Sequence, residues 1–207
     1  MPVSNTAKPR GPKTLDDLDA RFETQRAVLG PLVRVVEEAA AESPWALIGA
    51  AGLALRGLDA SSPNLEFMVT EPALRALAGM LDVTARWGRG AYLAAERLHF
   101  MRYGVPVFVF GRPVFHGRYE SLSPFDIPSL WDARARIDVG GGGVCVTPLE
   151  WDLMLSVVLE SRSRIDVLRE HLTEHGFDNR LLTRLLREGR VERATEEAVW
   201  AVVERSD

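Results

Sequence analysis

An apolar run followed at once by small residues constrains the fold of this chain more than any other feature. Trp45–Ile48 predicts a short buried strand, and the small residues after it open a short helix over Ala50–Arg56 that ends at Gly57. Leu65–Val69 predicts another strand a few residues later. A strand, a short helix and a strand in this order indicate a sheet with helices packed against it.

The neighbouring segments continue this pattern. Apolar residues at helical spacing predict a helix over Leu15–Val36, with a kink or a break at Gly30-Pro31, and another helix over Glu71–Met80. Tyr103-Gly104 predicts a hairpin turn between two strands. Further strands are expected at Val83–Trp87, Arg97–Arg102, Val105–Phe110 and Val144–Val146, and a short helix at Pro128–Ala135.

The last part of the chain is predicted to be helical. Thr147 and Glu150, with Pro148 between them, form a capping-box pattern that predicts a helix start. Helices are expected over 148–160, 163–174, 179–188 and 195–205. The four glycines at 140–143 predict a flexible connection rather than a phosphate cradle, because neither a Lys-Ser/Thr pair nor a helix start follows them.

These elements predict an α+β fold with a mixed sheet flanked by helices and covered by a C-terminal helical layer. The expected organisation is a disordered leader over residues 1–14, an α/β core over 15–147, and a helical region over 148–207 packed on that core. The proline-containing, polar composition of the first 14 residues is the reason for setting them apart.

Composition narrows the class of protein. The 207 residues carry a formal net charge of −4, so no global field attracts nucleic acid or an acidic membrane. Cys145 is the single cysteine, which excludes a disulfide within the chain and favours a reducing compartment, the cytoplasm. No run of about 18 apolar residues exists, so no membrane span is expected. Arginine replaces lysine after Lys13, a skew typical of a GC-rich bacterial genome.

The first strand–turn–helix carries the clearest chemistry. Small residues at Gly49 and Ala50 would let a phosphate approach the backbone N–H groups of the turn. Asn64 and Glu66 are two apart on the next strand, so their side chains point to the same side. Two polar side chains at a strand end, facing a helix start, form an arrangement suited to metal-assisted phosphoryl chemistry.

In this stretch the sequence resembles the minimal nucleotidyltransferase fold, in particular the group that includes the AbiEii-type toxins of bacterial toxin–antitoxin systems. The resemblance places Gly49-Ala50 at the family's glycine pair and Arg56-Gly57 at the end of its short helix. It places Asn64 and Glu66 at two metal-binding acids. It therefore implies that Gly49, Ala50 and Arg56 contact a nucleotide or its phosphates.

Later elements extend the resemblance to roughly residues 44–172. Thr147-Pro148 opens a leucine-rich helix, as in the family, and Arg162 to Asp166 matches an Arg-x-x-x-Asp element. A third acid normally follows a glycine turn on a later strand. Here that stretch, Gly104–Gly111, holds no acid, and Asn64 replaces another acid.

Two Mg²⁺ ions need several oxygen ligands, preferably carboxylates. Glu66 and Asn64 alone supply too little charge, so we expect a catalytically degenerate domain that retains nucleotide binding. Distant acids that could complete the site are Asp59, Glu96, Asp126 and Asp132. One alternative is an active transferase that uses Mg²⁺ and a nucleoside triphosphate to modify RNA, protein or a small acceptor. The other is a protein-interaction module of a toxin–antitoxin-like pair, with the helical C-terminus as its docking surface.

Two further patterns have mainly structural interpretations. His171 and His175 share a helix face, and a solvated polar face is favoured over a zinc site. Arg180, Arg184 and Arg187 form a basic stripe opposite a leucine face. An ordinary amphipathic helix is favoured there over a nucleic-acid contact, which is not excluded.

Overall fold

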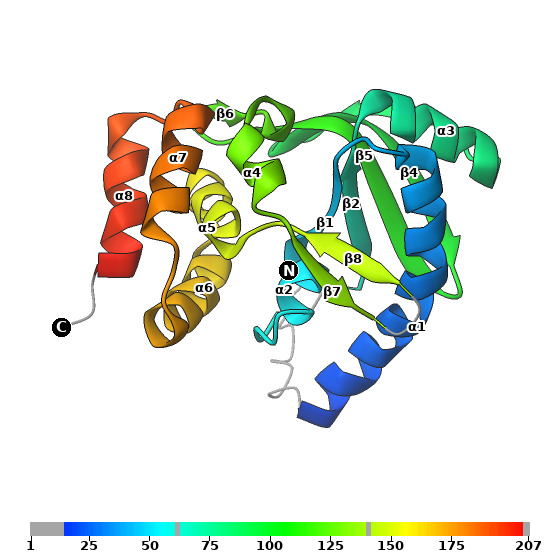
Figure 1. The fold of residues 1–207 in the computed structure, drawn as a ribbon, viewed down its shortest axis with the longest axis horizontal. Coiled ribbons are helices and arrows are strands. Elements are labelled where there is room, and N and C mark those ends of the chain that lie inside the picture. The colour runs from blue at the N-terminus through cyan, green and yellow to red at the C-terminus, as the bar shows by residue number, and fades with distance from the viewer. Residues whose placement is uncertain (1–14, 61–62, 140–141, 205–207) are drawn as a thin grey trace, which may run out of the picture.

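The computed structural model describes residues 15–60, 63–139 and 142–204, so the predicted leader over 1–14 lies outside the described residues. A mixed sheet occupies the centre of the fold, with the strand order β3-β4-β5-β2-β1-β8-β7 and β6 paired to β5 (Figure 1). Its strands are β1 (Trp45–Ile48), β2 (Leu65–Val69), β3 (Arg86–Arg89), β4 (Leu93–Arg102), β5 (Val105–His116), β6 (Ser121–Leu122), β7 (Ala135–Asp138) and β8 (Gly143–Val146).

Helices cover both faces of this sheet. They are α1 (Leu15–Ala40), α2 (Gly49–Ala54), α3 (Glu71–Leu81), α4 (Pro128–Asp132), α5 (Leu149–Val158), α6 (Arg162–His175), α7 (Asn179–Gly189) and α8 (Arg193–Glu204), with a 3₁₀ turn at Pro124–Asp126. Figure 1 shows α5–α8 on one side of the sheet and α1 and α3 on the other. The predicted α+β class, with a mixed sheet and a C-terminal helical layer, is confirmed.

Parallel and antiparallel pairs meet in the middle of the sheet. β1 runs antiparallel to β2 and parallel to β8, and β2 runs parallel to β5. Each edge is an antiparallel arrangement, β3-β4-β5 on one side and β7-β8 on the other. The β4–β5 hairpin turns at Tyr103 and Gly104, which have φ angles of 48° and 79°, so the predicted turn is confirmed.

The strands supply side chains to two separate apolar cores. Trp45 and Leu47 of β1 pack with α1 and α3, whereas Ala46 and Ile48 pack with α2 and the C-terminal helices. This alternation is what period-two side chains produce when both faces of a sheet are covered. Helix α5 lies in the centre of the second core, and each residue from Leu149 to Ser156 is buried.

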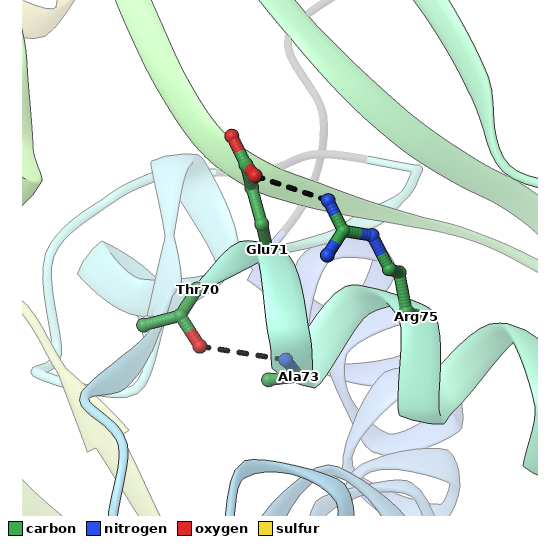
Figure 2. A network of polar contacts seen from close by, with 4 residues as sticks. All are labelled: Thr70, Glu71, Ala73 and Arg75. Carbon is green, nitrogen blue, oxygen red and sulfur yellow. Dashed lines mark hydrogen bonds and ion pairs between the residues drawn. The ribbon is translucent and has the colours of Figure 1, made fainter.

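Helix α3 shows how local sequence sets an element's start. The Thr70 hydroxyl oxygen accepts a hydrogen bond from the Ala73 N–H at 3.4 Å, which caps the first turn (Figure 2). Glu71 and Arg75, one turn apart, form an exposed ion pair at 3.2 Å. Asp82 ends the helix in the left-handed region, with a φ of 52°.

Several predicted boundaries are corrected. The helix α1 runs without a break through Pro31, so the two-helix interpretation is wrong. The strand predicted at Val83–Trp87 begins at Arg86, because Val83 and Ala85 pack into the core after the end of α3 instead of pairing. The helix predicted to reach Ala135 ends at Asp132, and Ala135–Asp138 forms β7.

The capping box at Thr147 is also wrong. The hydroxyl of Thr147 donates to both carboxylate oxygens of Asp152, at 3.1 and 3.0 Å, and makes no cap bond. Glu150 accepts a hydrogen bond from the Asp178 N–H at 2.8 Å and does not bond back to Thr147. Both Thr147 and Glu150 therefore form their hydrogen bonds with other residues than those of the predicted cap. Within the described residues, no helix is long and apolar enough to cross a membrane.

Candidate functional site

Gly49 forms the turn between β1 and α2, and its shape places it directly beside Glu66. The residue has a φ of +71°, which lies in the left-handed region that side chains rarely adopt. A Cβ atom at this position would stand 2.8 Å from Oε2 of Glu66. The absence of a side chain at Gly49 thus makes room for the Glu66 carboxylate above the turn.

Glu66 lies on the sheet face that the C-terminal helices cover. It pairs with Ile48 across β1–β2, and it is two residues from Met68, which belongs to the same core as Ile48. The Asn64 amide donates a hydrogen bond from Nδ2 to Oε1 of Glu66 at 2.7 Å. The prediction that Asn64 and Glu66 point to the same side is therefore confirmed.

Two opposing effects act on the carboxyl of Glu66. Burial raises its pKa, because the charged form loses water. The nearby Arg164 of α6 and the hydrogen bond from Asn64 lower the pKa, and the net shift is upward. The carboxyl group of Glu66 thus lies near one end of β2, close to the positive charge of Arg164 and hydrogen-bonded to the Asn64 amide.

The neighbouring position on β5 carries a phenyl ring. Phe108 pairs with Glu66 in the parallel β2–β5 ladder, so the two side chains lie next to each other on one face. On its other side Phe108 pairs with His99 of β4, and the two rings stack with centroids 4.4 Å apart. The structure therefore places Phe108, and not an acid, beside Glu66.

The residues around Glu66 do not fit a two-metal site. Asn64 directs an N–H donor at the carboxylate, where a metal ligand would present an oxygen. In the described part of the chain, no group of three or more His, Cys, Asp or Glu side chains is arranged to hold a metal ion. These residues therefore do not support a metal-dependent step at this site.

The four distant acids that could have completed the site lie in separate parts of the fold. Asp59 lines a pocket next to α2. Asp126 forms an ion pair with Arg112 at 2.9 Å, and more than half of each side chain is exposed. Asp132 is the last residue of α4, and Glu96 pairs with Gly111 on the opposite side of β5 from Glu66's strand.

A network of hydrogen bonds links Arg56, just after α2, to α5, and the sequence predicted a role in the site only for Arg56. The Arg56 guanidinium donates from Nη2 to the carbonyl oxygen of Thr147. The Thr147 hydroxyl donates to Asp152, so Thr147 connects the arginine and the acid. Arg56 was predicted to contact phosphate, and this contact with Thr147 uses one end of its guanidinium.

The ionisable groups of this network, Arg56 and Asp152, lie where a protein core usually has none. Burial raises the pKa of Asp152 to about 7, against the opposing effects of Arg56 and the Thr147 hydrogen bond. Burial lowers the pKa of Arg56, while Asp152 and Glu150 act in the opposite direction. Arg164 acts on both Glu66 and Asp152, so α6 brings one positive charge to both acids.

Sequence reasoning missed Asp152 and Arg164. The signal available for Asp152 was its position inside an otherwise apolar helix, where an acid needs a partner. Arg164 lies between the two residues of the Arg162–Asp166 element, and nothing in the spacing singled it out.

A pocket of about 240 Å³ lies between α2 and α6, next to these groups. Arg164 and two serine hydroxyls contribute polar groups, and α2 contributes its small first residues. The lining residues are Ala50, Leu53, Asp59, Ala60, Ser161, Ser163, Arg164 and Val167. The pocket therefore contains Ala50, which the sequence predicted as a site residue, and Arg164, which it did not predict.

The other predicted patterns have structural surroundings. His171 and His175 stack with ring centroids 4.3 Å apart, and burial and His175 lower the pKa of His171. Arg180, Arg184 and Arg187 are exposed on α7, opposite four buried leucines, as expected for an amphipathic helix. Cys145 lies half-buried on β8 as a free thiol.

The fold was compared with solved protein structures, and the similar ones are nucleotidyltransferase-like. A candidate nucleotidyltransferase of Thermotoga maritima superposes with a TM-score of 0.52 at 14% identity, over 70% of this chain and 92% of that one. The antibiotic-resistance factor ANT(2'')-Ia has 12% identity and a TM-score of 0.41, over 88% of this chain and 92% of its own. An antigenic nucleotidyltransferase-like protein from Paracoccidioides brasiliensis has 13% identity and a TM-score of 0.41, over 94% and 100%.

No protein-family model and no curated protein sequence matches the chain. The similarity to the Thermotoga maritima structure establishes the class of fold, which is nucleotidyltransferase-like. At 14% identity it does not extend to the reaction.

Proposed function

We propose that this protein is a catalytically degenerate member of the nucleotidyltransferase superfamily that binds a nucleotide in the pocket between α2 and α6. The observation that carries the proposal is the neighbourhood of Glu66. Phe108 stands beside it on β5, and the amide of Asn64 donates to it. A two-metal reaction needs carboxylates at such positions, so binding without transfer is the function that these residues support best.

The pocket has groups suited to a phosphorylated ligand. Arg164 offers a guanidinium, which binds phosphate through paired hydrogen bonds, and Ser161 and Ser163 offer hydroxyl donors. Ala50 and Leu53 provide the apolar side of the pocket. In this proposal the phosphates lie near Arg164, and Glu66 limits how closely a negative charge approaches the Gly49 turn.

The resemblance to the AbiEii-type group belongs to the same proposal. It is supported by the order of the matching elements, from Gly49-Ala50 and Arg56-Gly57 to Thr147-Pro148. A bacterial origin and a partner protein of the toxin–antitoxin kind would follow from membership. Copurification of one small neighbouring-gene product in stoichiometric amounts would support that membership, and recovery of this chain alone would contradict it.

Isothermal titration calorimetry with ATP, GTP, CTP and UTP tests the nucleotide pocket. We expect binding of at least one nucleotide, both with Mg²⁺ and with a chelator. Arg164→Ala should weaken it by roughly tenfold or more, the loss expected for a charged phosphate contact. Arg169→Ala is the matched control, because Arg169 is an exposed arginine of the same helix that pairs with Asp166. A folded protein that binds none of the four nucleotides would overturn the proposal.

The active-transferase alternative makes a different prediction. It requires incorporation of a labelled nucleotide into RNA, protein or a small acceptor, dependence on Mg²⁺, and loss of activity in Glu66→Gln. Such an outcome would refute degeneracy while leaving nucleotide binding in place. We expect no incorporation, because a metal ion would find one carboxylate at this position.

A further inference from the structure

The sheet face that carries Glu66 continues outward as an open surface. Glu66, Phe108 and His99 are register partners on β2, β5 and β4, so they form one row across three strands. Phe108 is half-buried and His99 is exposed, which means that cover by the C-terminal helices fades along this row. The outer part of the face is therefore accessible to a ligand.

A groove of about 600 Å³ lies along this outer part, at the β3 edge of the sheet. Its size falls within the roughly 300–1,000 Å³ typical of small-molecule sites. The lining residues are Asp82, Val83, Thr84, Arg86, Trp87, Arg97, His99 and Phe108. Phe108 joins the groove to the Glu66 neighbourhood, since it belongs to both.

Two arginines of the groove lie opposite each other on neighbouring strands. Arg86 and Arg97 are direct partners in the antiparallel β3–β4 ladder, and like charges directly opposite each other are destabilising. Both are exposed, and neither has an ion-pair partner among the residues that the structure describes. Asp82 brings an acid to the groove wall, which leaves a net positive charge.

The lack of a side chain at Gly88 leaves space for the Arg97 guanidinium. A Cβ atom on Gly88 would stand 3.3 Å from Cζ and Nη2 of Arg97, so the guanidinium lies over the glycine backbone. The charged group therefore lies along the surface of β3, over the residue two positions from Arg86. An anion bound between the two arginines would relieve their repulsion and accept hydrogen bonds from both.

Aromatic surfaces border the same groove. The rings of His99 and Phe108 are nearly parallel, with an interplanar angle of 2°, and form a stacked pair. Trp87, beside Arg86 on β3, has 71% of its surface exposed and also lines the groove. Exposed aromatic faces next to arginines are the combination that binds nucleic-acid bases and their phosphates.

We propose that this groove binds a nucleoside phosphate unit, with the base on the stacked rings of His99 and Phe108 and the phosphate between Arg86 and Arg97. The unit is either a free nucleotide or the terminal nucleotide of a single strand, since both present the same groups. The site is separate from the pocket between α2 and α6, and it goes beyond the function proposed above. It places an aromatic base along the row that leads to Glu66.

Fluorescence of Trp87 and anisotropy of a labelled oligonucleotide test the groove. AMP is titrated alongside adenosine and ribose 5-phosphate, which each lack one half of the ligand, and alongside a short labelled oligoadenylate. We expect AMP or the oligonucleotide to quench Trp87 and both halves to bind more weakly. Trp87→Phe assigns the signal to Trp87.

The variant Arg86→Gln/Arg97→Gln should weaken binding by roughly tenfold or more. The control Arg89→Gln/Arg102→Gln removes the same charge from the same two strands, outside the groove lining. Equal losses in the two variants would reduce the effect to general electrostatics and overturn the proposal, as would no binding of AMP or oligonucleotide at millimolar concentration.

One comparison distinguishes a free nucleotide from a strand end, and another distinguishes this groove from the pocket between α2 and α6. Binding of AMP with no gain for the oligonucleotide identifies a free nucleotide, and much tighter oligonucleotide binding identifies a strand end. Arg164→Ala should leave the Trp87 signal unchanged, because Arg164 lines the other pocket. Loss of the Trp87 signal in Arg164→Ala would show one shared site and contradict a separate groove.

Discussion

Oε2 of Glu66 lies 2.8 Å from the point where a Cβ atom on Gly49 would stand. The Glu66 carboxylate thus occupies space that a side chain at the turn after β1 would need. A larger residue at position 49 would have to displace the carboxylate, and the loss of the carboxylate would leave space above the turn.

Gly49→Ala is expected to destabilise the fold by more than Gly57→Ala. Both glycines have positive φ angles, 71° and 82°, so both substitutions incur a backbone cost of about 1–2 kcal/mol. At Gly57 nothing lies within 4 Å of an added Cβ, whereas at Gly49 the Glu66 side chain must move, at an additional cost of about 0.5–1.5 kcal/mol. Urea unfolding of both variants measures the difference. In a Glu66→Ala background that difference should disappear, and its persistence would refute the proposed contact.

The stability of the protein should fall as pH rises from about 4 to about 7. Asp152 has a raised pKa of about 7 in the fold against 3.8 unfolded, so in this window the folded state holds a proton that the unfolded state has lost. The stabilisation is complete below the unfolded pKa, declines by about 1.4 kcal/mol per pH unit, and is gone above the folded pKa. The raised pKa of Glu66 acts in the same direction.

Unfolding free energies across this pH range, for wild type and Asp152→Asn, provide the measurement. The variant cannot titrate at this position, so its stability should change less steeply with pH. Parallel curves for the two proteins would contradict a raised pKa at Asp152.

Thr147 should behave as a partner of Asp152 and not as a helix cap. Thr147→Val removes the hydroxyl and leaves a buried carboxylate without that donor, at a cost of about 1–3 kcal/mol. The cost should be larger above pH 7, where Asp152 is charged, than at pH 5. Thr147→Ser keeps the hydroxyl and should retain most of the stability. A cap bond would give a cost that does not depend on pH, so a flat pH response would restore the capping interpretation.

Asn64→Asp should create a response to divalent cations that the wild type lacks. The variant loses the hydrogen bond to Glu66 and places a second carboxylate beside it, which should destabilise the apo protein by about 1–2 kcal/mol. A cation that binds both acids stabilises the folded state by mass action. Thermal unfolding with and without Mn²⁺ tests this expectation.

The same substitution at an exposed position, Asn179→Asp, is the control, since it adds equal charge at the start of α7. Only Asn64→Asp should gain thermal stability with Mn²⁺. An equal gain in the wild type would show that Glu66 and Asn64 already hold a metal, and would contradict catalytic degeneracy.

Much of the fold was predictable because strong local patterns coincide with buried elements. Trp45–Ile48 is apolar throughout and Leu65–Val69 is apolar except for Glu66, and both strands have the predicted bounds. β7 was missed because its side chains alternate between half-buried and exposed at the sheet edge, with Ala135 and Ile137 as its only apolar residues. An edge strand of this kind depends on pairing with β8, which a local pattern does not contain.

The candidate site was less predictable for a different reason. Asn64 immediately precedes β2 and Glu66 is its second residue, so their common orientation follows from the extended spacing of two. Asp152 and Arg164 come from helices far along the chain, and only the packing of α5 and α6 on the sheet brings their charges to Glu66 and Arg56. The hydroxyl of Thr147 had two possible partners, and the buried Asp152 competes better than a solvated helix end.

The separation of the two apolar cores has a consequence for divergence between relatives. Trp45 and Leu47 hold β1 against α1 and α3, while Ala46 and Ile48 meet the C-terminal helices. Because each face is packed independently, substitutions among α5–α8 can change the cover of the Glu66 row without altering the register of the strands beneath it. A lineage can therefore exchange what its binding surfaces recognise while it inherits the same sheet.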